Sequence, residues 1–439
     1  MHLRMGKPSI AGRRAPARAR AWLGALALLA ALGACAPTLA ASPGAHAGEA
    51  LAASSPSSPQ ARRGCAANVL ETLGGVLDRV YREGVASERT LAAEHLIAGS
   101  APLREAVEDD NPRAARTAAR ALLATGHMSN LRILRDGRTL VDLGGPALAP
   151  LRGTLAGADG EPIATYLASV WADSSFVDEA DGIARGFVAL RENGRSIAGS
   201  FALARGALAK EGRLTRDHAV LQYTSFPAEA FPSGQLRVYL LRTVSSAAAL
   251  CGRTREDTLV DTLRQVAELI YAGETGEAAL AQVKRVQRNE ALLQAVAKRE
   301  PEATRLAIDK LLTEHIVRLR VSVGGTLLAD VGGPYVLAPV QGQLRLHGRP
   351  IGSFVLSIQD DEGYLRLARR LAGLDVLMYE DPAHPLLVKD SLGPAFGEVP
   401  TSGVYDDDGR VFRVFTLHAQ AFPSGPLLIV VLVPIPYPA

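Results

Sequence analysis

From about Cys65 to its end, the chain consists of two copies of one sequence repeat. Similar stretches recur at an offset of 188 to 191 residues, and Ala230-Phe231-Pro232-Ser233-Gly234 returns unchanged at residues 421–425. A solenoid has a repeat of about 20 to 50 residues, whereas each copy here has enough residues to bury a core of its own. We therefore predict two similar domains in tandem, residues 65–250 and 251–439, each with its own core.

The first 34 residues have the composition of an export signal. They contain six basic residues and no acidic one, and an apolar stretch rich in Leu and Ala runs from Trp22 to Leu32. That stretch is shorter than the about 20 apolar residues that a membrane-spanning helix needs. Residues 1–34 are therefore predicted to be a signal peptide, which places the mature chain outside the cytoplasm.

The end of this signal, Leu32-Gly33-Ala34-Cys35, resembles the lipobox of bacterial lipoproteins, in which the cysteine is acylated and becomes the new N-terminus. The resemblance implies a lipid anchor at Cys35 on the extracytoplasmic face of the membrane. The alternative is ordinary cleavage after a small residue, which gives a secreted protein. Residues 35–64 are rich in Ala, Ser, Pro and Gly and are predicted to be a flexible tether.

Two further cysteines, Cys65 and Cys251, each stand just before the first predicted helix of a copy. In an oxidising compartment, a pair placed in this way favours one disulfide that clamps the two copies together. The alternative is two separate buried thiols.

The net charge of the mature chain argues against a nucleic-acid partner. Without the six basic residues of the signal peptide, 42 of the 48 basic residues remain against 45 acidic ones, a net charge near −3. Binding to nucleic acid requires a basic patch. No nucleic-acid partner is therefore predicted.

Each copy shows helix signals followed by strand signals. A helix is predicted to start at Asn111-Pro112, and another to be capped by Asp360 or Asp361 and to end near Gly373. Asp136-Gly137 and Gly324-Gly325 predict two-residue hairpin turns, and residues 427–433 predict the last strand. The order is two helices, three strands, one helix and three strands. It predicts an α+β fold in which each copy is a mainly antiparallel sheet preceded by helices.

That order resembles the PAS-like Cache (PDC) sensor domain, which is found outside bacterial cells. The residues that carry the resemblance are Leu319-Arg320-Val321, Gly324-Gly325, Asp330 and the stretch 348–358. The resemblance covers both copies and implies binding of a small molecule such as an amino acid, an organic acid or an amine, without a cofactor. Family members usually carry a membrane helix and an output domain. This chain shows neither, so a separate membrane signalling partner is expected.

Six residues are candidates for contact with such a ligand: Arg132, Asp142, Tyr166, Arg320, Asp330 and Tyr335. A guanidinium can hold a carboxylate, an aspartate can bind an amine, and tyrosine rings can line a pocket. Each type also has an ordinary structural role. The arginines can lie on a solvated strand face, the aspartates can accept backbone N–H bonds in a turn, and the tyrosines can fill the core.

No motif predicts an enzyme. The sequence has no nucleophile elbow, no phosphate-binding glycine loop, no zinc-protease motif and no Cys-x-x-Cys pair. His127 and His315 are equivalent in the two copies but have no second ligand at metal-binding spacing, so no metal site is predicted. The main hypothesis is a lipid-anchored small-molecule sensor. The alternative is a structural or protein-interaction lipoprotein that has kept the Cache fold and lost ligand binding.

Overall fold

The structure is a computed structural model that describes residues 59–126, 128–273, 276–312, 316–333, 336–380, 386–393, 397–422 and 425–437. The predicted signal peptide, 1–34, and Cys35 lie outside the described residues. The predicted tether, 35–64, needs a correction at its end because helix α1 already starts at Pro59. Proline suits the first position of a helix, and the Ala and Arg residues that follow favour helix. No helix of the described part is long and apolar enough to cross a bilayer.

Within the described residues, four helices open each copy, where the sequence predicted two. Short polar residues separate them, since Ser87, Ser100 and Asn111 each accept a hydrogen bond from the backbone N–H three residues later. The predicted helix start at Asn111-Pro112 is thus confirmed. The helices are α1 (Pro59–Ala86), α2 (Glu88–Ala98), α3 (Ala101–Glu108) and α4 (Pro112–Thr125), then α7 (Arg255–Gly273), α8 (Glu277–Arg288), α9 (Glu290–Lys298) and α10 (Pro301–Leu312).

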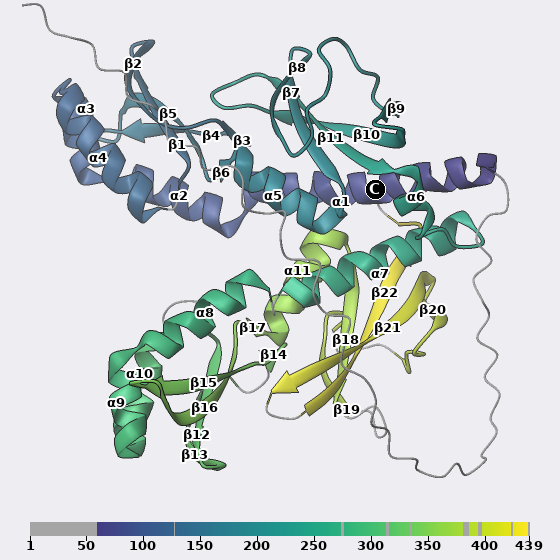
Figure 1. The fold of residues 1–439 in the computed structure, drawn as a ribbon. Helices are drawn as coiled ribbons and strands as arrows, with labels where there is room; N and C mark the ends of the chain where they lie inside the picture. The colour runs from purple at the N-terminus through teal and green to yellow at the C-terminus, as the bar shows by residue number, and fades with distance from the viewer. Residues whose placement is uncertain are drawn as a thin grey trace, which may run out of the picture. The chain divides into compact units, whose positions relative to one another are not determined.

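A four-stranded antiparallel sheet follows these helices in each copy (Figure 1). The strand orders are β2-β1-β5-β4 and β13-β12-β16-β15. The predicted turns are confirmed, because Asp136, Gly137, Gly324 and Gly325 all have positive φ, between 50° and 83°. The strands are β1 (Asn130–Arg135), β2 (Arg138–Gly144), β4 (Leu151–Ala156) and β5 (Pro162–Ser169), then β12 (Arg318–Val323), β13 (Thr326–Gly332), β15 (Val340–Leu346) and β16 (Arg349–Ser357).

A second antiparallel sheet follows in each copy, with strand orders β8-β7-β11-β10-β9 and β17-β14-β21-β22-β18-β19, where β20 pairs with β21 and where β14 (Val336–Leu337) and β17 (Gln359–Asp360) have two residues each. The predicted α+β class with mainly antiparallel sheets is confirmed, but each copy has two such sheets where one was expected. Local strand patterns do not tell which strands pair. The strands are β7 (Phe187–Glu192), β8 (Arg195–Gly199), β9 (Gly212–Arg216), β10 (Ala219–Glu229) and β11 (Gln235–Thr243), then β18 (Asp375–Glu380), β19 (Leu386–Asp390), β20 (Gly403–Asp407), β21 (Arg410–Phe422) and β22 (Gly425–Ile435).

In chain order, one helix follows the first sheet of each copy and precedes the second. It is α5 (Asp173–Ala184) in the first copy and α11 (Asp361–Ala372) in the second. Asp360 caps α11 by accepting a hydrogen bond from the N–H of Gly363, and Gly373 ends the helix with a φ of 60°, as predicted. Short strand pairs lead into these helices, and a short helix closes the first copy. They are β3 (Ala147–Leu148) with β6 (Trp171–Ala172), β14 (Val336–Leu337) with β17 (Gln359–Asp360), and α6 (Val244–Ala248).

The apolar run 427–433 is confirmed as the last strand, and its position explains why it does not alternate with polar residues. Ile429, Val431 and Val433 belong to the core on the helix side of the sheet. Leu428, Val430 and Leu432 belong to a smaller core on the opposite face. Because both faces of β22 are covered, every side chain of the run is buried.

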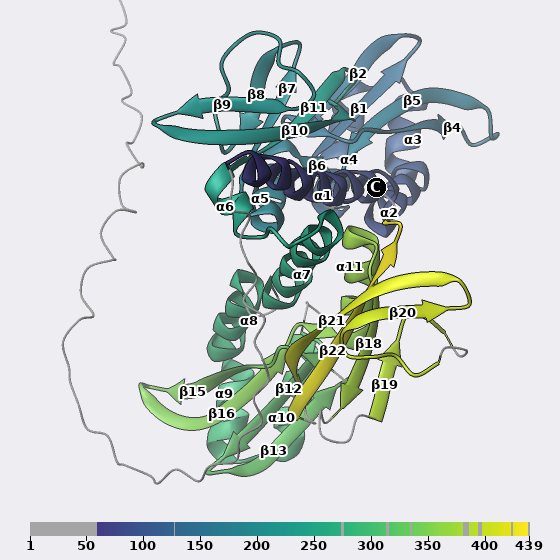
Figure 2. The same cartoon turned by 90° about the vertical axis from the view of Figure 1, so that its right-hand side faces the viewer.

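One apolar core contains residues of both copies, which corrects the expectation that each copy buries a core of its own. The first sheet of each copy has a separate core, represented by Leu131 and by Leu319. The shared core combines α1, α5 and the second sheet of the first copy with α7, α11 and the second sheet of the second copy (Figure 2). The described residues accordingly belong to one compact unit. The division at 250/251 stays a prediction.

Covalent and ionic links reinforce this shared core. The structure contains the disulfide between Cys65 and Cys251, with the two Cα atoms 5.8 Å apart, a separation that suits a disulfide. An ion pair joins Arg370 of α11 to Glu83 of α1. The two copies are therefore held together by apolar packing, charge and a covalent bond.

We predict that the disulfide contributes about 2 to 5 kcal/mol to the free energy of unfolding, because it closes a loop of 186 residues and thereby restricts the unfolded chain. Urea unfolding with and without reductant measures this contribution. The double variant Cys65→Ala/Cys251→Ala is the control, which reductant must leave unchanged. Equal stability of the oxidised and reduced wild type would contradict the prediction.

Candidate functional site

In the first copy, the predicted ligand residues Arg132 and Asp142 pair with each other. They lie opposite one another on β1 and β2, and Nη2 of Arg132 is 2.7 Å from Oδ2 of Asp142. The guanidinium also lies over the ring of Phe231, 5.8 Å from its centroid. Asp142 of β2 and Phe231, which follows β10, are therefore both close to Arg132, at the junction of the two sheets.

In the second copy, two arginines hold Asp330. Arg318 donates Nε and Nη2 to the two carboxylate oxygens, both at 2.8 Å, and Arg320 donates Nη2 at 2.6 Å. The ring of Phe422 lies 5.0 and 4.7 Å from these two guanidiniums. Burial raises the pKa of Asp330, but the hydrogen bonds and charges of the two arginines outweigh it and hold the pKa below its ordinary value.

The carboxylates of Asp142 and Asp330 thus each pair with arginine. This role differs from both that were considered from the sequence, which were contact with a ligand amine and acceptance of backbone N–H bonds in a turn. Arg132 and Arg320 are half-buried at this pair and are not on a fully solvated face. A ligand carboxylate would have to displace Asp142 or Asp330 to reach these arginines. The ligand role of these four residues stays a prediction.

The side chain of Tyr166 packs in the core on one face of the first sheet. It is 2% exposed. Gly153 lies beneath the ring, where a Cβ atom would come within 2.2 Å of the tyrosine oxygen, so only glycine leaves room for the ring. Gly342 and Phe354 repeat this arrangement in the second copy. Tyr335, the sixth predicted residue, lies outside the described residues.

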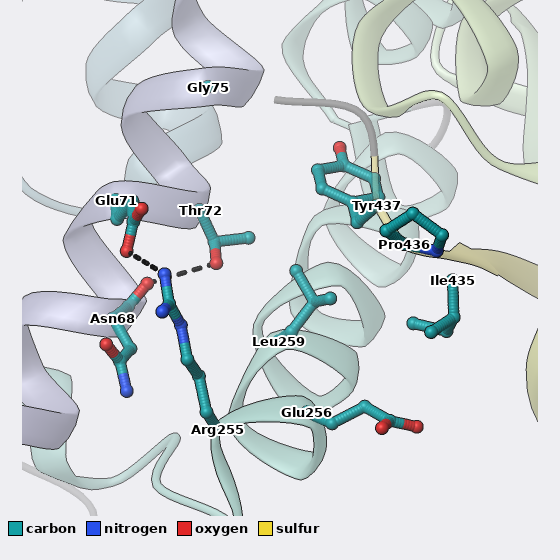
Figure 3. A pocket seen from close by; sticks show the side chains of 10 residues that line it. All are labelled: Asn68, Glu71, Thr72, Gly75, Arg255, Glu256, Leu259, Ile435, Pro436 and Tyr437. Atoms are coloured by element: carbon teal, nitrogen blue, oxygen red, sulfur yellow. Dashed lines mark hydrogen bonds and ion pairs between the residues drawn. The ribbon is translucent and has the colours of Figure 1, made fainter.

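A pocket of about 430 Å³ lies between the first helices of the two copies (Figure 3). Its volume falls in the range of small-molecule sites, about 300 to 1,000 Å³. Three parts of the chain form it: α1, the start of α7, and the end of β22 with the residues after it. The lining residues are Asn68, Glu71, Thr72 and Gly75, then Arg255, Glu256 and Leu259, then Ile435, Pro436 and Tyr437.

The polar side of the pocket carries both signs of charge. Nη2 of Arg255 is 2.7 Å from Oε2 of Glu71, so this ion pair connects α7 to α1. Both side chains are largely exposed, and such a pair contributes at most about 1 kcal/mol. Thr72 donates its hydroxyl to the carbonyl oxygen of Asn68 at 3.0 Å. A charged ligand can therefore replace the ion pair at low cost.

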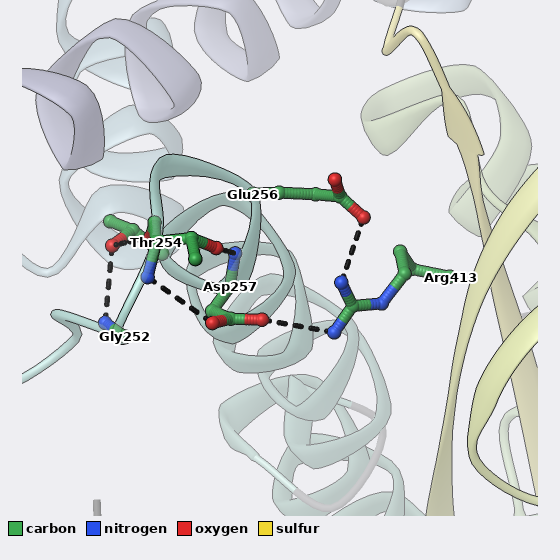
Figure 4. Close-up of polar contacts among 6 residues, drawn as sticks. Gly252, Thr254, Glu256, Asp257 and Arg413 are labelled. Carbon is green, nitrogen blue, oxygen red and sulfur yellow. Dashed lines mark hydrogen bonds and ion pairs between the residues drawn. The ribbon is translucent and has the colours of Figure 1, made fainter.

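The start of α7 fixes the second carboxylate of the pocket (Figure 4). Thr254 and Asp257 cap the helix reciprocally, since each side chain accepts a hydrogen bond from the other residue's backbone N–H, at 3.0 and 3.2 Å. Arg413 of β21 donates to Glu256 at 2.8 Å and to Asp257 at 2.9 Å. Burial raises the pKa of Asp257, but the bonds to Thr254 and Arg413 outweigh it and lower the pKa.

The apolar wall of the pocket is anchored on both sides. Tyr437 donates its hydroxyl to the carbonyl oxygen of Ala372, at the end of α11, at 2.7 Å. The guanidinium of Arg79 in α1 lies 5.6 Å from the centre of the Tyr437 ring. Burial raises the pKa of this tyrosine, so it stays neutral at physiological pH. The wall therefore holds an aromatic ring in place beside the charged groups.

None of the residues that line this pocket was among the ligand contacts predicted from the sequence. They come from segments about 190 and 370 residues apart in the chain, and the lining residues of α1 and α7 are not equivalent positions of the repeat. The one local signal was Arg255-Glu256-Asp257, a cluster of charges at the start of a predicted helix. Chemically, the pocket offers one guanidinium, two carboxylates, an amide and an apolar wall.

Among the residues that the structure describes, no group of three or more His, Cys, Asp and Glu side chains is placed to hold a metal ion. The two histidines considered in the sequence, His127 and His315, lie outside those residues.

No protein-family model and no curated protein sequence matches the chain. Several solved structures are similar to it at low identity. The periplasmic domain of Vibrio cholerae LuxQ is 9% identical with a TM-score of 0.27, over 40% of this chain and 98% of that one. The ligand-binding domain of the Pseudomonas fluorescens chemoreceptor CtaA in complex with L-isoleucine is 11% identical with a TM-score of 0.29, over 44% and 98%. The extracellular domain of the putative histidine kinase vpHK1S-Z8 is 10% identical with a TM-score of 0.28, over 45% and 98%.

We predict that Asp330→Asn lowers the free energy of unfolding by about 2 kcal/mol at pH 7, because two arginines lose a charged partner. The pKa of Asp330 is lowered by folding, so its contribution is present above the unfolded pKa, near 3.8, and is lost as the pH falls through the lower folded pKa. Asp142→Asn is the matched control. Its carboxylate is 46% exposed against 15% for Asp330, so we expect a loss below about 1 kcal/mol.

Urea unfolding of both variants at several pH values measures these effects. Equal losses in the two copies, or a loss from Asp330→Asn that is undiminished at the lowest pH at which the protein still folds, would contradict the account of the Asp330 cluster.

Proposed function

We propose that this chain is an exported, lipid-anchored protein that binds a small molecule of the amino acid, organic acid or amine class and reports it to a membrane signalling partner. The observation that carries the proposal is the pocket between α1 and α7, which is lined by the Arg255–Glu71 ion pair, by Glu256 and by an apolar wall. The export signal and the Cache resemblance of the sequence support the same function. A pocket that is lined by a guanidinium and by carboxylates suits a ligand that carries a carboxylate, an ammonium group, or both.

The position of the pocket supplies a mechanism for reporting. A ligand there contacts α1 of one copy and α7 of the other, and α1 is the helix that follows the predicted tether and lipid anchor. The ligand therefore favours one packing of these helices to the extent that it binds that packing more tightly. A partner in the membrane that contacts α1 can read this difference.

A second candidate is a structural or interaction protein without a ligand. It is favoured by the contacts of the residues predicted from the sequence, because Asp330 is already paired with Arg318 and Arg320 and the middle of each first sheet is filled by an aromatic ring. Under this reading the pocket between α1 and α7 is a gap in an interface, and small molecules leave the protein unaffected.

We expect at least one amino acid, organic acid or amine to raise the melting temperature by several degrees, since a ligand at 100 times its Kd stabilises the fold by about 2.7 kcal/mol. Gly75→Leu is expected to abolish the shift. Gly75 lines the pocket, and a Cβ atom there meets no atom within 4 Å, so a side chain at this position starts in open space. Gly75→Ala is the control, because it gives the same gain in helix propensity and leaves most of the space open.

A thermal-shift screen of these compound classes decides between the two candidates. If no compound shifts the wild type, or if Gly75→Leu responds as the wild type does, ligand binding in this pocket is wrong.

Lipid anchoring is tested separately. We expect the intact mass of the protein from the membrane fraction to correspond to a chain that starts at Cys35 and carries a diacylglycerol group. Cys35→Ala is expected to remove the adduct and release the protein from the membrane. A wild-type chain that is cleaved elsewhere and lacks the added mass would instead identify a secreted protein.

A further inference from the structure

A second hollow, of about 620 Å³, lies over the second sheet of the first copy. It is formed by residues of β7, β9 and β10, by the ends of β8 and β11 and by the segment after β8, and Figure 1 shows these strands in one sheet. Phe187 of β7 lines it, whereas its neighbour Val188 points to the shared core on the other face. None of its lining residues belongs to the pocket between α1 and α7.

Two phenylalanines and an arginine give this hollow its chemistry. The rings of Phe187 and Phe201 have centroids 5.3 Å apart, and Phe187 is 38% exposed. The guanidinium of Arg216 lies 4.6 Å from the centre of the Phe201 ring. An exposed aromatic surface next to a planar cation is the environment that binds a flat anion, because the ring of the anion stacks and its charge meets the guanidinium.

The polar partners of Arg216 leave it accessible to such an anion. Nη1 donates to the carbonyl oxygen of Ala202 at 3.2 Å. Nε is 3.6 Å from Oδ2 of Asp217, whose side chain is 91% exposed. An ion pair this long and this exposed to water contributes little, so a ligand carboxylate can replace Asp217.

The second copy has different residues at the same positions. Ser200 and Ser391 mark the register, because each accepts a hydrogen bond from the backbone N–H of the equivalent strand residue, at 3.0 and 2.8 Å. In this register the second copy has Asp375 in place of Phe187, Leu392 in place of Phe201 and Asp407 in place of Arg216. Asp407 is paired with Arg410, which stands at the position of Ala219 and lies 5.8 Å from the ring centre of Phe412, at the position of Leu221. The second copy therefore has an arginine that is paired with a carboxylate beside one aromatic ring, where the first copy has Arg216 beside Phe201, whose ring contacts that of Phe187.

We propose that this hollow binds a small planar aromatic carboxylate, with its ring against Phe187 and Phe201 and its carboxylate on Arg216. This site is independent of the pocket between α1 and α7, and of whether that pocket takes a ligand. Its ligand class is narrower, since it requires both a flat ring and a negative charge.

Fluorine NMR of 4-fluorobenzoate with the purified mature protein tests the proposal. We expect saturable broadening with a Kd of about 1 mM or tighter. Arg216→Gln is expected to weaken binding about tenfold and Phe201→Leu about fivefold. Asp217→Asn is expected to tighten binding about twofold, because it removes the competing carboxylate. This gain of affinity does not arise from a folding defect.

Controls on both the probe and the protein complete the experiment. Benzoate should displace the fluorinated probe, whereas cyclohexanecarboxylate, which has the charge but no flat ring, should not. Gly75→Leu should bind the probe as the wild type does, because its substitution lies in the other pocket. Thermal unfolding verifies each variant, and Phe187→Leu replaces Phe201→Leu if the latter does not fold. Absence of saturable binding, equal binding by wild type and Arg216→Gln, or equal displacement by cyclohexanecarboxylate would overturn the proposal.

Discussion

The packing of α1 against α7 is the constraint on which the rest of the structure depends. At 100° per residue, the buried positions of α1 cover roughly 200° of its circumference, more than the single stripe of a surface helix. Gly74 faces β10 of its own copy so closely that a Cβ atom would lie 2.9 Å from Thr224. Thr72, on another flank, lines the pocket that α7 helps to form. A helix buried on both flanks requires the second copy as a folding partner.

The two copies meet as the subunits of a symmetric dimer do. In an interface of that kind, equivalent elements make reciprocal contacts. Here α1 and α7 contact each other, α1 contacts α11, and α7 contacts α5, which is the equivalent of α11 (Figure 2). The disulfide and the single chain keep the two copies together. Glu71 and Arg255 stand at non-equivalent positions of the two helices, so the ion pair that lines this pocket does not follow the repeat.

Features that depend on neighbouring residues could be predicted from the sequence, and features that depend on distant packing could not. The hairpin at Asp136-Gly137 and the caps at Asn111 and Asp360 follow from local backbone chemistry. The split into two sheets and the shared core depend on which apolar faces meet, and strand periodicity carries no such information. The opposing charges of Arg132 and Asp142 were visible on either side of a predicted turn. Their cross-strand pairing could therefore have been inferred, with the consequence that a ligand of either residue must compete with that pair.

The Asp142 and Asp330 clusters show that the side chains of one copy can differ from those of the other while the backbone contacts stay the same. Asn130 of the first copy occupies the position of Arg318, and its side-chain amide donates to the carbonyl oxygen of Gly145 as Arg318 does to that of Gly333. The backbone contact is thus kept while one positive charge is lost, and Asp142 keeps a single arginine where Asp330 has two. The shared core requires side chains from both copies, whereas the Asp142 and Asp330 clusters each lie within one copy. A difference such as Asn130 in place of Arg318 therefore changes the charge of one copy and leaves the shared core unchanged.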